Sequence, residues 1–274
     1  MSIDFKYIQT LIRNAEAVVI TAGAGMGVDS GLPDFRGNKG FWKAYPVLKD
    51  KKLSFKKIAS PKWFIKNPQL AWAFYGHRLN LYKNTKPHEG FTLLKEYLEK
   101  NEKEYFVFTS NVDGHFQKAG YDSDRIVEIH GSINFFQCTV ECVKKVWDAP
   151  DNELNIDISN MTIEDIPICP YCSRVARPNI LMFDDWFWME KRTYAQKMRY
   201  RKWIKEKKSV VVLEFGAGKV IPTVRNFSEE ETYKMERKES GTLIRINPQD
   251  ESVWRDQDIA IKMGAFEAIR KIVG

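Results

Sequence analysis

Four cysteines stand in two close pairs, Cys138 with Cys142 and Cys169 with Cys172, and 26 residues separate the pairs. Four thiolates at such spacing can surround a zinc ion as a tetrahedron, which is the usual structural zinc site. The first residues lack the order of a secretion signal, so disulfides are not expected. Four unrelated buried thiols are the alternative. The pattern predicts one structural Zn²⁺ ion with no position left open for catalysis.

A glycine-rich turn follows a short run of β-branched residues near the N-terminus. Residues 17–21 read as a buried strand, and Gly23, Ala24 and Gly25 come directly after it. A strand, a glycine turn and a helix in this order point backbone N–H groups at a phosphate. A glycine run by itself is a weak signal, and a tight turn without a ligand is the alternative.

The elements that would position these groups alternate along the chain. Strands are predicted at 17–21, 105–109, 125–129, 179–183, 209–215 and 242–246, and helices at 5–16, 90–100, 184–207 and 259–273. Such alternation favours a parallel sheet with helices on both faces. The predicted fold class is therefore α/β, a Rossmann-like parallel sheet with helices on both faces plus a smaller zinc-binding and helical domain.

Two insertions interrupt the alternation. Residues 41–85 are rich in lysine, aromatic residues and helix formers, and residues 132–177 hold the cysteines and an acidic irregular segment. We expect the first to be a helical insertion and the second a zinc-binding insertion, together forming the smaller domain. Residues 1–40, 86–131 and 178–274 then form the Rossmann-like nucleotide-binding domain, and a substrate cleft would lie between the two domains.

Positive charge is concentrated in one segment. The net charge is +7, and the densest basic stretch is 190–208. A solvated helix face is the favoured interpretation, so a nucleic-acid partner is not expected. The segment and the residues just before it carry aromatic side chains expected on one helical side: Trp186, Trp188, Tyr194, Tyr200 and Trp203. No apolar run has the length of a membrane span, which predicts a soluble, cytoplasmic protein without a membrane partner.

Several motifs together resemble the signature of a known family, the sirtuins, which are NAD-dependent protein deacylases. In chain order they are Gly23-Ala24-Gly25, SGLPDFRG at 30–37, TSNVD at 109–113, EIHGS at 128–132, the four cysteines, RPNILMF at 177–183 and Ile246-Asn247. The resemblance spans roughly residues 17 to 268, and the combined order is far more specific than a single glycine motif. It implies a divergent, bacterial-type sirtuin whose Rossmann-like domain binds NAD.

The resemblance also implies a reaction. Sirtuins cleave the bond between nicotinamide and ribose in NAD, and the acyl oxygen of an acylated protein lysine captures the ribose carbon. The products are free lysine, nicotinamide and O-acyl-ADP-ribose. An NAD-consuming ADP-ribosyltransferase or NAD hydrolase on the same fold is the alternative, and a non-catalytic sensor of NAD or acyl-lysine is a third. Neither the target protein nor the oligomeric state follows from the sequence.

Site residues are implied position by position. His130 would be the general base, Asn111 would hold the ribose and a water, and Asp113 would bond the nicotinamide amide. An Asx turn is the alternative for Asn111 and Asp113. Phe35 would shield the intermediate and Arg36 would meet phosphate. The whole set implied for NAD is Gly23, Ala24, Gly25, Asp34, Phe35, Arg36, Ser110, Asn111, Asp113, Gly216, Ala217, Gly218 and Asn247.

The chain departs from the family pattern at several positions. Ser110 replaces a usual glutamine, Gly216-Ala217-Gly218 replaces a glycine-threonine-serine, and Asp184 replaces a glycine. The second change removes two hydroxyl groups, so backbone amides would have to hold NAD there. Asp184 adds bulk and negative charge beside the expected path of the substrate peptide, so the substrate need not be an ordinary acetyl-lysine peptide.

A tyrosine and an arginine suggest which acyl group is preferred. Tyr75 and Arg78 lie three residues apart, and the segment around them resembles the acyl-pocket helix of sirtuins that prefer succinyl- and malonyl-lysine. A guanidinium can bind a carboxylate through two hydrogen bonds. An amphipathic helix whose arginine reaches toward solvent is the alternative.

Overall fold

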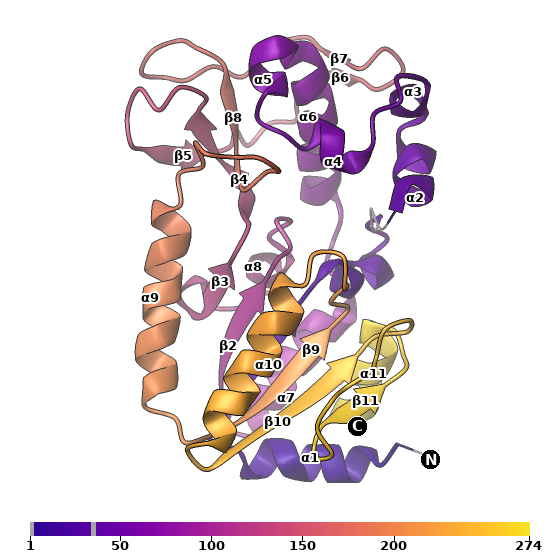
Figure 1. The fold of residues 1–274 in the computed structure, drawn as a ribbon, viewed down its shortest axis with the longest axis vertical. Helices are drawn as coiled ribbons and strands as arrows, with labels where there is room; N and C mark the ends of the chain where they lie inside the picture. The colour runs from indigo at the N-terminus through magenta and orange to yellow at the C-terminus, as the bar shows by residue number, and fades with distance from the viewer. Residues whose placement is uncertain (1–2, 34–36) are drawn as a thin grey trace.

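The larger sheet has six parallel strands and forms the lower half of the molecule in Figure 1. The computed structural model describes residues 3–33 and 37–274. Across the sheet the strands are β11 (Ile259–Ile261), β10 (Ser240–Ile246), β9 (Ser209–Phe215), β1 (Ala17–Ala22), β2 (Glu104–Thr109) and β3 (Ile126–Glu128). The predicted fold class is confirmed.

Alternating side chains of the central strands fill two cores, one on each face of the sheet. Val18 and Ile20 of β1 face one core and Val19 faces the other, because successive residues of a strand point to opposite faces. The first core is covered by α1 (Phe5–Asn14), α7 (Glu89–Lys100) and α11 (Ala265–Val273). The second is covered by α9 (Lys191–Lys205) and α10 (Thr223–Glu236), of which α10 lies in front in Figure 1.

A second group of elements, drawn at the top of Figure 1, shares a core of its own. It contains α2 (Gly37–Ala44), α3 (Pro46–Asp50), α4 (Phe55–Ile58), α5 (Trp63–Lys66), α6 (Pro68–Asn84), β4 (Gly131–Cys138), β5 (Val146–Asp148), β6 (Ile156–Asp157), β7 (Thr162–Ile163) and β8 (Ala176–Ile180). Strands β5, β4 and β8 form an antiparallel sheet. The Trp72 ring of α6 packs against Phe136 with 4.9 Å between ring centroids, and its indole N–H donates to the Ala176 carbonyl at 2.8 Å. The two sequence regions predicted as insertions thus pack together, while the proposed domain boundaries stay a prediction.

Short helices lie beside the strands of the larger sheet along the chain. Helix η1 (Ala24–Ser30) follows β1, α8 (His115–Lys118) follows β2, and η2 (Ser123–Arg125) precedes β3. The sequence predicted a helix after the glycine turn, and η1 is a 3₁₀ helix that ends at Ser30 and is capped by Gly31 with a left-handed φ of 83°.

Two predicted elements were wrong in their extent. The strand expected at 179–183 is β8, which ends at Ile180 and pairs with β4 in the small sheet. The closing helix expected at 259–273 begins with β11, because residues 259–261 pair with the end of β10. The helix proper starts after Gly264, where the Phe266 N–H donates to the Asp29 carboxylate at 2.9 Å.

The prediction for the basic segment was also wrong in part. The helix expected at 184–207 starts only at Lys191, so Trp186 precedes it and is 90% exposed. Tyr200 and Trp203 pack on the sheet, whereas Tyr194 is 53% exposed. Tyr200 and Trp203 are three residues apart and share a helix face, whereas Tyr194 is six residues from Tyr200 and lies on another face. The predicted aromatics therefore do not form one side of the helix. Among the described residues, no helix combines the length and apolarity that crossing a bilayer requires.

Candidate functional site

Most of the residues predicted to bind NAD follow the carboxyl ends of neighbouring parallel strands. Ala22, the last residue of β1, pairs directly with Thr109 of β2 and with Phe215 of β9. Thr109 in turn pairs with Glu128 of β3, and Phe215 pairs with Ile246 of β10. The residues that come next in each strand therefore lie side by side along one edge of the sheet, where ligands of open parallel sheets bind. These residues are Gly23, Ser110, Ile129, Gly216 and Asn247.

Two glycine turns touch each other at the centre of this edge. The Gly23 N–H donates to the Phe215 carbonyl at 2.9 Å, and the Gly25 N–H donates to the Gly216 carbonyl at 3.1 Å. A Cβ on Gly216 would lie 2.3 Å from the Gly25 Cα, and Gly216 has a left-handed φ of 58°. A Cβ on Gly23 would lie 2.8 Å from the Ala217 Cα. Only glycine allows both backbones to approach this closely.

The second turn, Gly216-Ala217-Gly218, has backbone N–H groups available for a ligand. The Ala217 carbonyl accepts from the Arg225 Nε at 3.1 Å and from the Asn247 Nδ2 at 2.9 Å, which orients the turn. Over the described part of the chain, the N–H groups of Ala217 and Gly218 donate to no protein acceptor, although Ala217 is only 1% exposed. Free backbone N–H groups of this kind suit the phosphate oxygens of NAD. The turn thus fits NAD without the two hydroxyl groups that the family pattern carries.

Arg225 is a residue of this edge that sequence reasoning missed. It lies on α10, is 5% exposed, and bonds both the Ala217 carbonyl and the Asp250 carbonyl. No motif surrounds it, so nothing in the sequence distinguished it from a surface arginine. Asn247 was predicted to bind NAD, but its side-chain amide bonds protein groups. Its Oδ1 accepts from the N–H of Gln249 and of Asp250.

Asn111 and Ser110 connect β2 to the first glycine turn. The Asn111 Nδ2 donates to the Gly23 carbonyl at 3.0 Å, and the Ser110 N–H donates to the Ala22 carbonyl at 3.1 Å. The Thr109 hydroxyl accepts from the Asn111 N–H at 3.0 Å and so holds this loop. Asn111 is half-buried, and its amide oxygen has no partner among the described residues. Its predicted role toward the ribose stays a prediction.

His130 lies between the parallel sheet and the small sheet. It is half-buried and directly precedes Gly131, where β4 begins with a φ of 77°. Burial lowers the pKa of the imidazole below its ordinary value, and a hydrogen bond to the backbone of Ser110 opposes this shift. The lowered pKa favours the neutral imidazole, in which one ring nitrogen can accept a proton.

The Asp113 side chain forms an Asx turn, which was the alternative to its predicted contact with nicotinamide. Its Oδ1 accepts from the His115 N–H at 2.9 Å, and the side chain is 7% exposed. Its Oδ2 would be 3.8 Å from a Cβ on Gly27, so the carboxylate points toward η1. Asp34, Phe35 and Arg36 fall outside the described residues, and their predicted roles stay predictions.

Tyr75 and Arg78 lie together in the core of the upper group of elements. The Arg78 guanidinium is 5.8 Å from the Tyr75 ring centroid and 5.5 Å from that of Phe74, and it donates to the Tyr82 hydroxyl at 2.7 Å. Tyr75 is 1% exposed, and burial raises the pKa of its hydroxyl well above the ordinary value. Arg78 is 7% exposed, and interactions with tyrosines outweigh burial to raise its pKa. The pair thus keeps one buried positive charge among aromatic rings.

The segment after β8 lies next to this pair. Phe183 packs on Phe55 with 6.2 Å between centroids, and the Arg78 guanidinium lies 5.9 Å from the centre of the same Phe55 ring. Asp184, the departure from the family's glycine, has a left-handed φ of 56° and is exposed. Asp185 forms a fully buried ion pair with Arg177 at 2.8 Å, which sequence reasoning missed.

The four cysteines form one cluster. Their sulfur atoms all lie within 4.8 Å of one another, and the Cys138–Cys172 and Cys142–Cys169 sulfur distances are both 3.6 Å. A tetrahedral zinc with bonds of about 2.3 Å would put sulfurs about 3.8 Å apart, whereas a disulfide would put them about 2 Å apart. Burial raises the pKa of Cys138, but the N–H groups of Val140 and Cys142 and the neighbouring thiols lower it to about 7. The cluster fits one structural zinc ion.

The longer first cysteine pair needs a left-handed residue. Cys138 ends β4, and Glu141 turns the chain back with a φ of 49° before Cys142. In the second pair, the Ser173 N–H donates to the Cys169 carbonyl at 2.9 Å, and Ser173 has a φ of 57°. Both loops thus bend so that two thiols from each meet.

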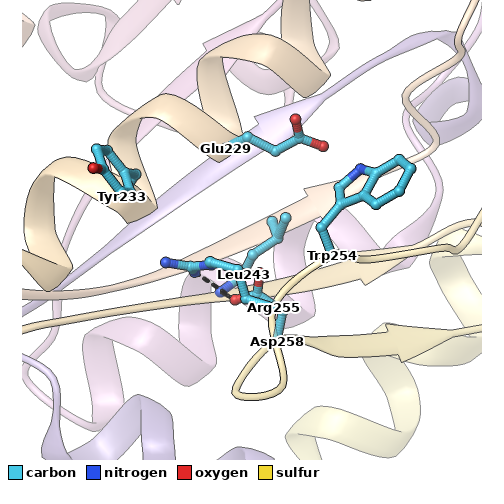
Figure 2. A pocket seen from close by; sticks show the side chains of 6 residues that line it. All are labelled: Glu229, Tyr233, Leu243, Trp254, Arg255 and Asp258. Atoms are coloured by element: carbon cyan, nitrogen blue, oxygen red, sulfur yellow. Dashed lines mark hydrogen bonds and ion pairs between the residues drawn. The ribbon is translucent and has the colours of Figure 1, made fainter.

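A surface pocket of about 230 Å³ lies between α10 and the loop before β11 (Figure 2). It is lined by Glu229, Tyr233, Leu243, Trp254, Arg255 and Asp258. Its carboxylates are already engaged, Asp258 with Arg255 at 2.5 Å and Glu229 with Arg245 at 2.9 Å. The pocket contains none of the predicted site residues.

Comparison with known proteins gives concordant results. A family model described as the Sir2 family matches residues 23–207, more than half of the chain. NAD-dependent protein deacylase 1 of Caldanaerobacter subterraneus is 26% identical over 268 residues, covering 98% of this chain and 97% of that protein. The NAD-dependent protein deacylase of Pyrococcus abyssi is 27% identical, covering 97% and 95%. The fold is similar to that of a Sir2 homologue crystallised with NAD, with a TM-score of 0.75, 22% identity and coverage of 99% and 93%.

Proposed function

This chain belongs to the Sir2 family, and we propose that it removes acyl groups from protein lysines with NAD as the co-substrate. Its relatives in Caldanaerobacter and Pyrococcus carry the name NAD-dependent protein deacylase and match over nearly the whole chain. In the proposed reaction the bond between nicotinamide and ribose breaks, and the acyl oxygen of the lysine bonds to the freed ribose carbon. A cytoplasmic location and acylated protein lysines as partners are part of the proposal.

One observation carries this proposal, namely the pairing of strand ends that brings His130, Asn111 and the two glycine turns to one edge. The N–H groups of buried Ala217 and half-buried Gly218 supply the phosphate contacts. Once the acyl oxygen has replaced nicotinamide on the ribose carbon, the neutral His130 imidazole takes the proton from a ribose hydroxyl as that hydroxyl oxygen adds to the acyl carbon, and water then completes the release of free lysine. Asn111, tied to Gly23, positions the ribose. The zinc ion, held by the four cysteines, is structural because four thiolates leave it no open position.

The product identifies the reaction. The protein is incubated with NAD and an acetyl-lysine or succinyl-lysine peptide, and products are identified by mass spectrometry. O-acyl-ADP-ribose together with free lysine is expected. The His130→Ala variant should lose at least about 100-fold in rate, as for a missing general base, with an unchanged melting temperature. ADP-ribosylated protein, or free ADP-ribose without any acyl product, would replace this proposal with ADP-ribosyl transfer or NAD hydrolysis.

We further propose that the enzyme favours acidic acyl groups. The support is the buried guanidinium of Arg78, which stays charged beside Tyr75 and next to the segment after β8. A succinyl or malonyl carboxylate entering there would accept two hydrogen bonds from the guanidinium. An acetyl group would gain nothing from this charge.

A ratio of rates tests this preference. The Arg78→Met variant should lower the ratio of succinyl to acetyl kcat/KM by about tenfold or more, the effect of losing a charged hydrogen bond. The Arg78→Lys variant keeps the charge without the planar fork, so its ratio should fall between the two. An unchanged ratio in a folded Arg78→Met protein would discard the acidic-acyl preference and leave the deacylase proposal intact.

A further inference from the structure

The whole excess of positive charge in this protein belongs to one helix. Residues 190–208 hold nine of the 43 basic side chains and two of the 36 acidic ones, so 34 of each remain elsewhere. The rest of the chain is therefore neutral, and the net charge of +7 is the charge of α9 and its two ends. Figure 1 shows α9 along one side of the molecule, with the sheet on its inner side and no element on its outer side.

The inner face of α9 accounts for only some of these charges. Arg192 pairs with Glu128 at the end of β3, Arg199 pairs with Asp124, and Lys207 pairs with Glu104. Glu128 and Glu104 lie on strands β3 and β2, and Asp124 lies in η2 just before β3, so these pairs attach the helix to the sheet. Three large apolar side chains of the helix, Tyr200, Trp203 and Ile204, are buried on the same inner face, whereas Met198 is 44% exposed.

The outer side carries cations without counter-charges. Over the described part of the chain no ion pair involves the remaining six basic residues, Lys191, Lys197, Arg201, Lys202, Lys205 and Lys208. Five of these side chains are exposed, and Lys197 is half-buried. Most recur three or four residues apart, so they follow one stripe of the helix, which also includes the exposed Tyr194. We refer to these six basic residues as the α9 basic stripe.

Contrary to the expectation from the sequence, we propose that the α9 basic stripe binds the phosphate backbone of a nucleic acid. An interfacial membrane helix inserts an apolar face, but the apolar face of α9 is already buried against the sheet. What remains exposed contacts a partner mainly by charge, and a rigid row of cations matches a regular row of phosphates. Exposed Tyr194 adds a ring on which an unpaired base can stack. The N-terminal end of α9 reaches Glu128 at the carboxyl end of β3, but no residue of the α9 basic stripe belongs to the predicted NAD or acyl site, so this binding does not depend on the proposed catalysis.

A matched pair of triple variants tests this inference. Binding of a fluorescein-labelled 24-base-pair DNA duplex is measured by anisotropy at several salt concentrations. For the unmodified protein we expect binding that weakens with salt with a log–log slope of about −4 to −5, since each neutralised phosphate contributes about −0.9. Arg201→Glu/Lys202→Glu/Lys205→Glu should weaken binding at least about tenfold and flatten that slope by about 3.

The control variant changes net charge equally but elsewhere. Lys6→Glu/Lys86→Glu/Lys100→Glu alters three exposed lysines, and binding should weaken by no more than about threefold. Both variants should keep their melting temperature and their activity on free acyl-lysine peptides. Equal losses in the two variants, no binding at 50 mM salt, or tighter binding to polyglutamate or to phosphatidylglycerol vesicles than to DNA would each overturn the inference.

Discussion

His130 can accept a proton only if one ring nitrogen keeps a free lone pair. Burial favours the neutral ring, and the backbone of Ser110 opposes this effect. Ser110 is one of the departures from the family pattern, yet it acts on His130 through its backbone, which a residue of any type would supply. The exchange of a usual glutamine for serine is therefore compatible with a neutral base at His130.

The lowered pKa of His130 predicts the pH dependence of the reaction. A base must be deprotonated, so kcat/KM should rise with pH through the pKa of the free enzyme. Because burial lowers the pKa of His130, the midpoint of this acidic limb should fall below the ordinary histidine value of about 6.5. A kcat/KM profile between pH 5 and 8 measures it. A midpoint at or above 6.5 would contradict the role of burial.

At the scale of elements, parallel strands do most of the positioning. The last residues of β1, β2, β3, β9 and β10 are paired in register, so each following loop starts at the same edge. Two of these loops, at Gly23 and at Gly216, contact each other through backbone atoms. Their contact sets the distance between the two halves of the expected NAD site.

Two neighbouring glycines provide a matched test of this contact. Gly216→Ala places a Cβ 2.3 Å from the Gly25 Cα at a left-handed φ, so the turns must separate. We expect it to lower the melting temperature and to raise the Kd for NAD at least about tenfold. Gly218→Ala meets no atom within 4 Å and should change both values little. Calorimetric titration with NAD compares them, and equal effects would contradict the steric argument.

At the scale of the whole molecule, His130 lies where the chain passes from the large parallel sheet to the small antiparallel sheet. The parallel sheet ends at β3, and β4 of the small sheet begins one residue after His130. The other end of β4 is Cys138, a member of the thiol cluster. One strand thus connects the predicted base to the predicted zinc ligands.

Removal of zinc should therefore unfold more than the cysteine loops. A chelator should release about one zinc ion per chain, lower the melting temperature by at least about 5 °C and abolish deacylation, since structural zinc supplies folding free energy. Re-addition of zinc should restore part of both. Metal analysis by atomic absorption accompanies the melting curve. Complete metal loss with an unchanged melting temperature would contradict a structural role.

Local patterns in the sequence were enough for the features that depend on neighbours along the chain. The run Ser209–Phe215 was predicted as a strand and is β9 with the same bounds, because the apolar, mostly β-branched run Val210–Leu213 identifies a strand without reference to its partners. The spacing of the cysteines within each pair predicted a metal site, and the structure confirms that the four thiols lie together. The glycine turn after β1 was likewise identified by residue type, and the family motifs by their order.

Tertiary structure alone decided which distant side chains meet. The buried pairs Arg177–Asp185 and Arg245–Glu214, and the contact of Arg225 with Ala217, join residues whose spacing carries no pattern. Strand β8 pairs with β4 and so belongs to the small sheet rather than the large one. The pattern of apolar residues in a strand does not indicate which strand will be its partner. Which face of α9 is buried, and so which cations are left exposed, follows from where the sheet lies. Burial and pairing are properties of the packed chain, since each depends on atoms far apart in the sequence.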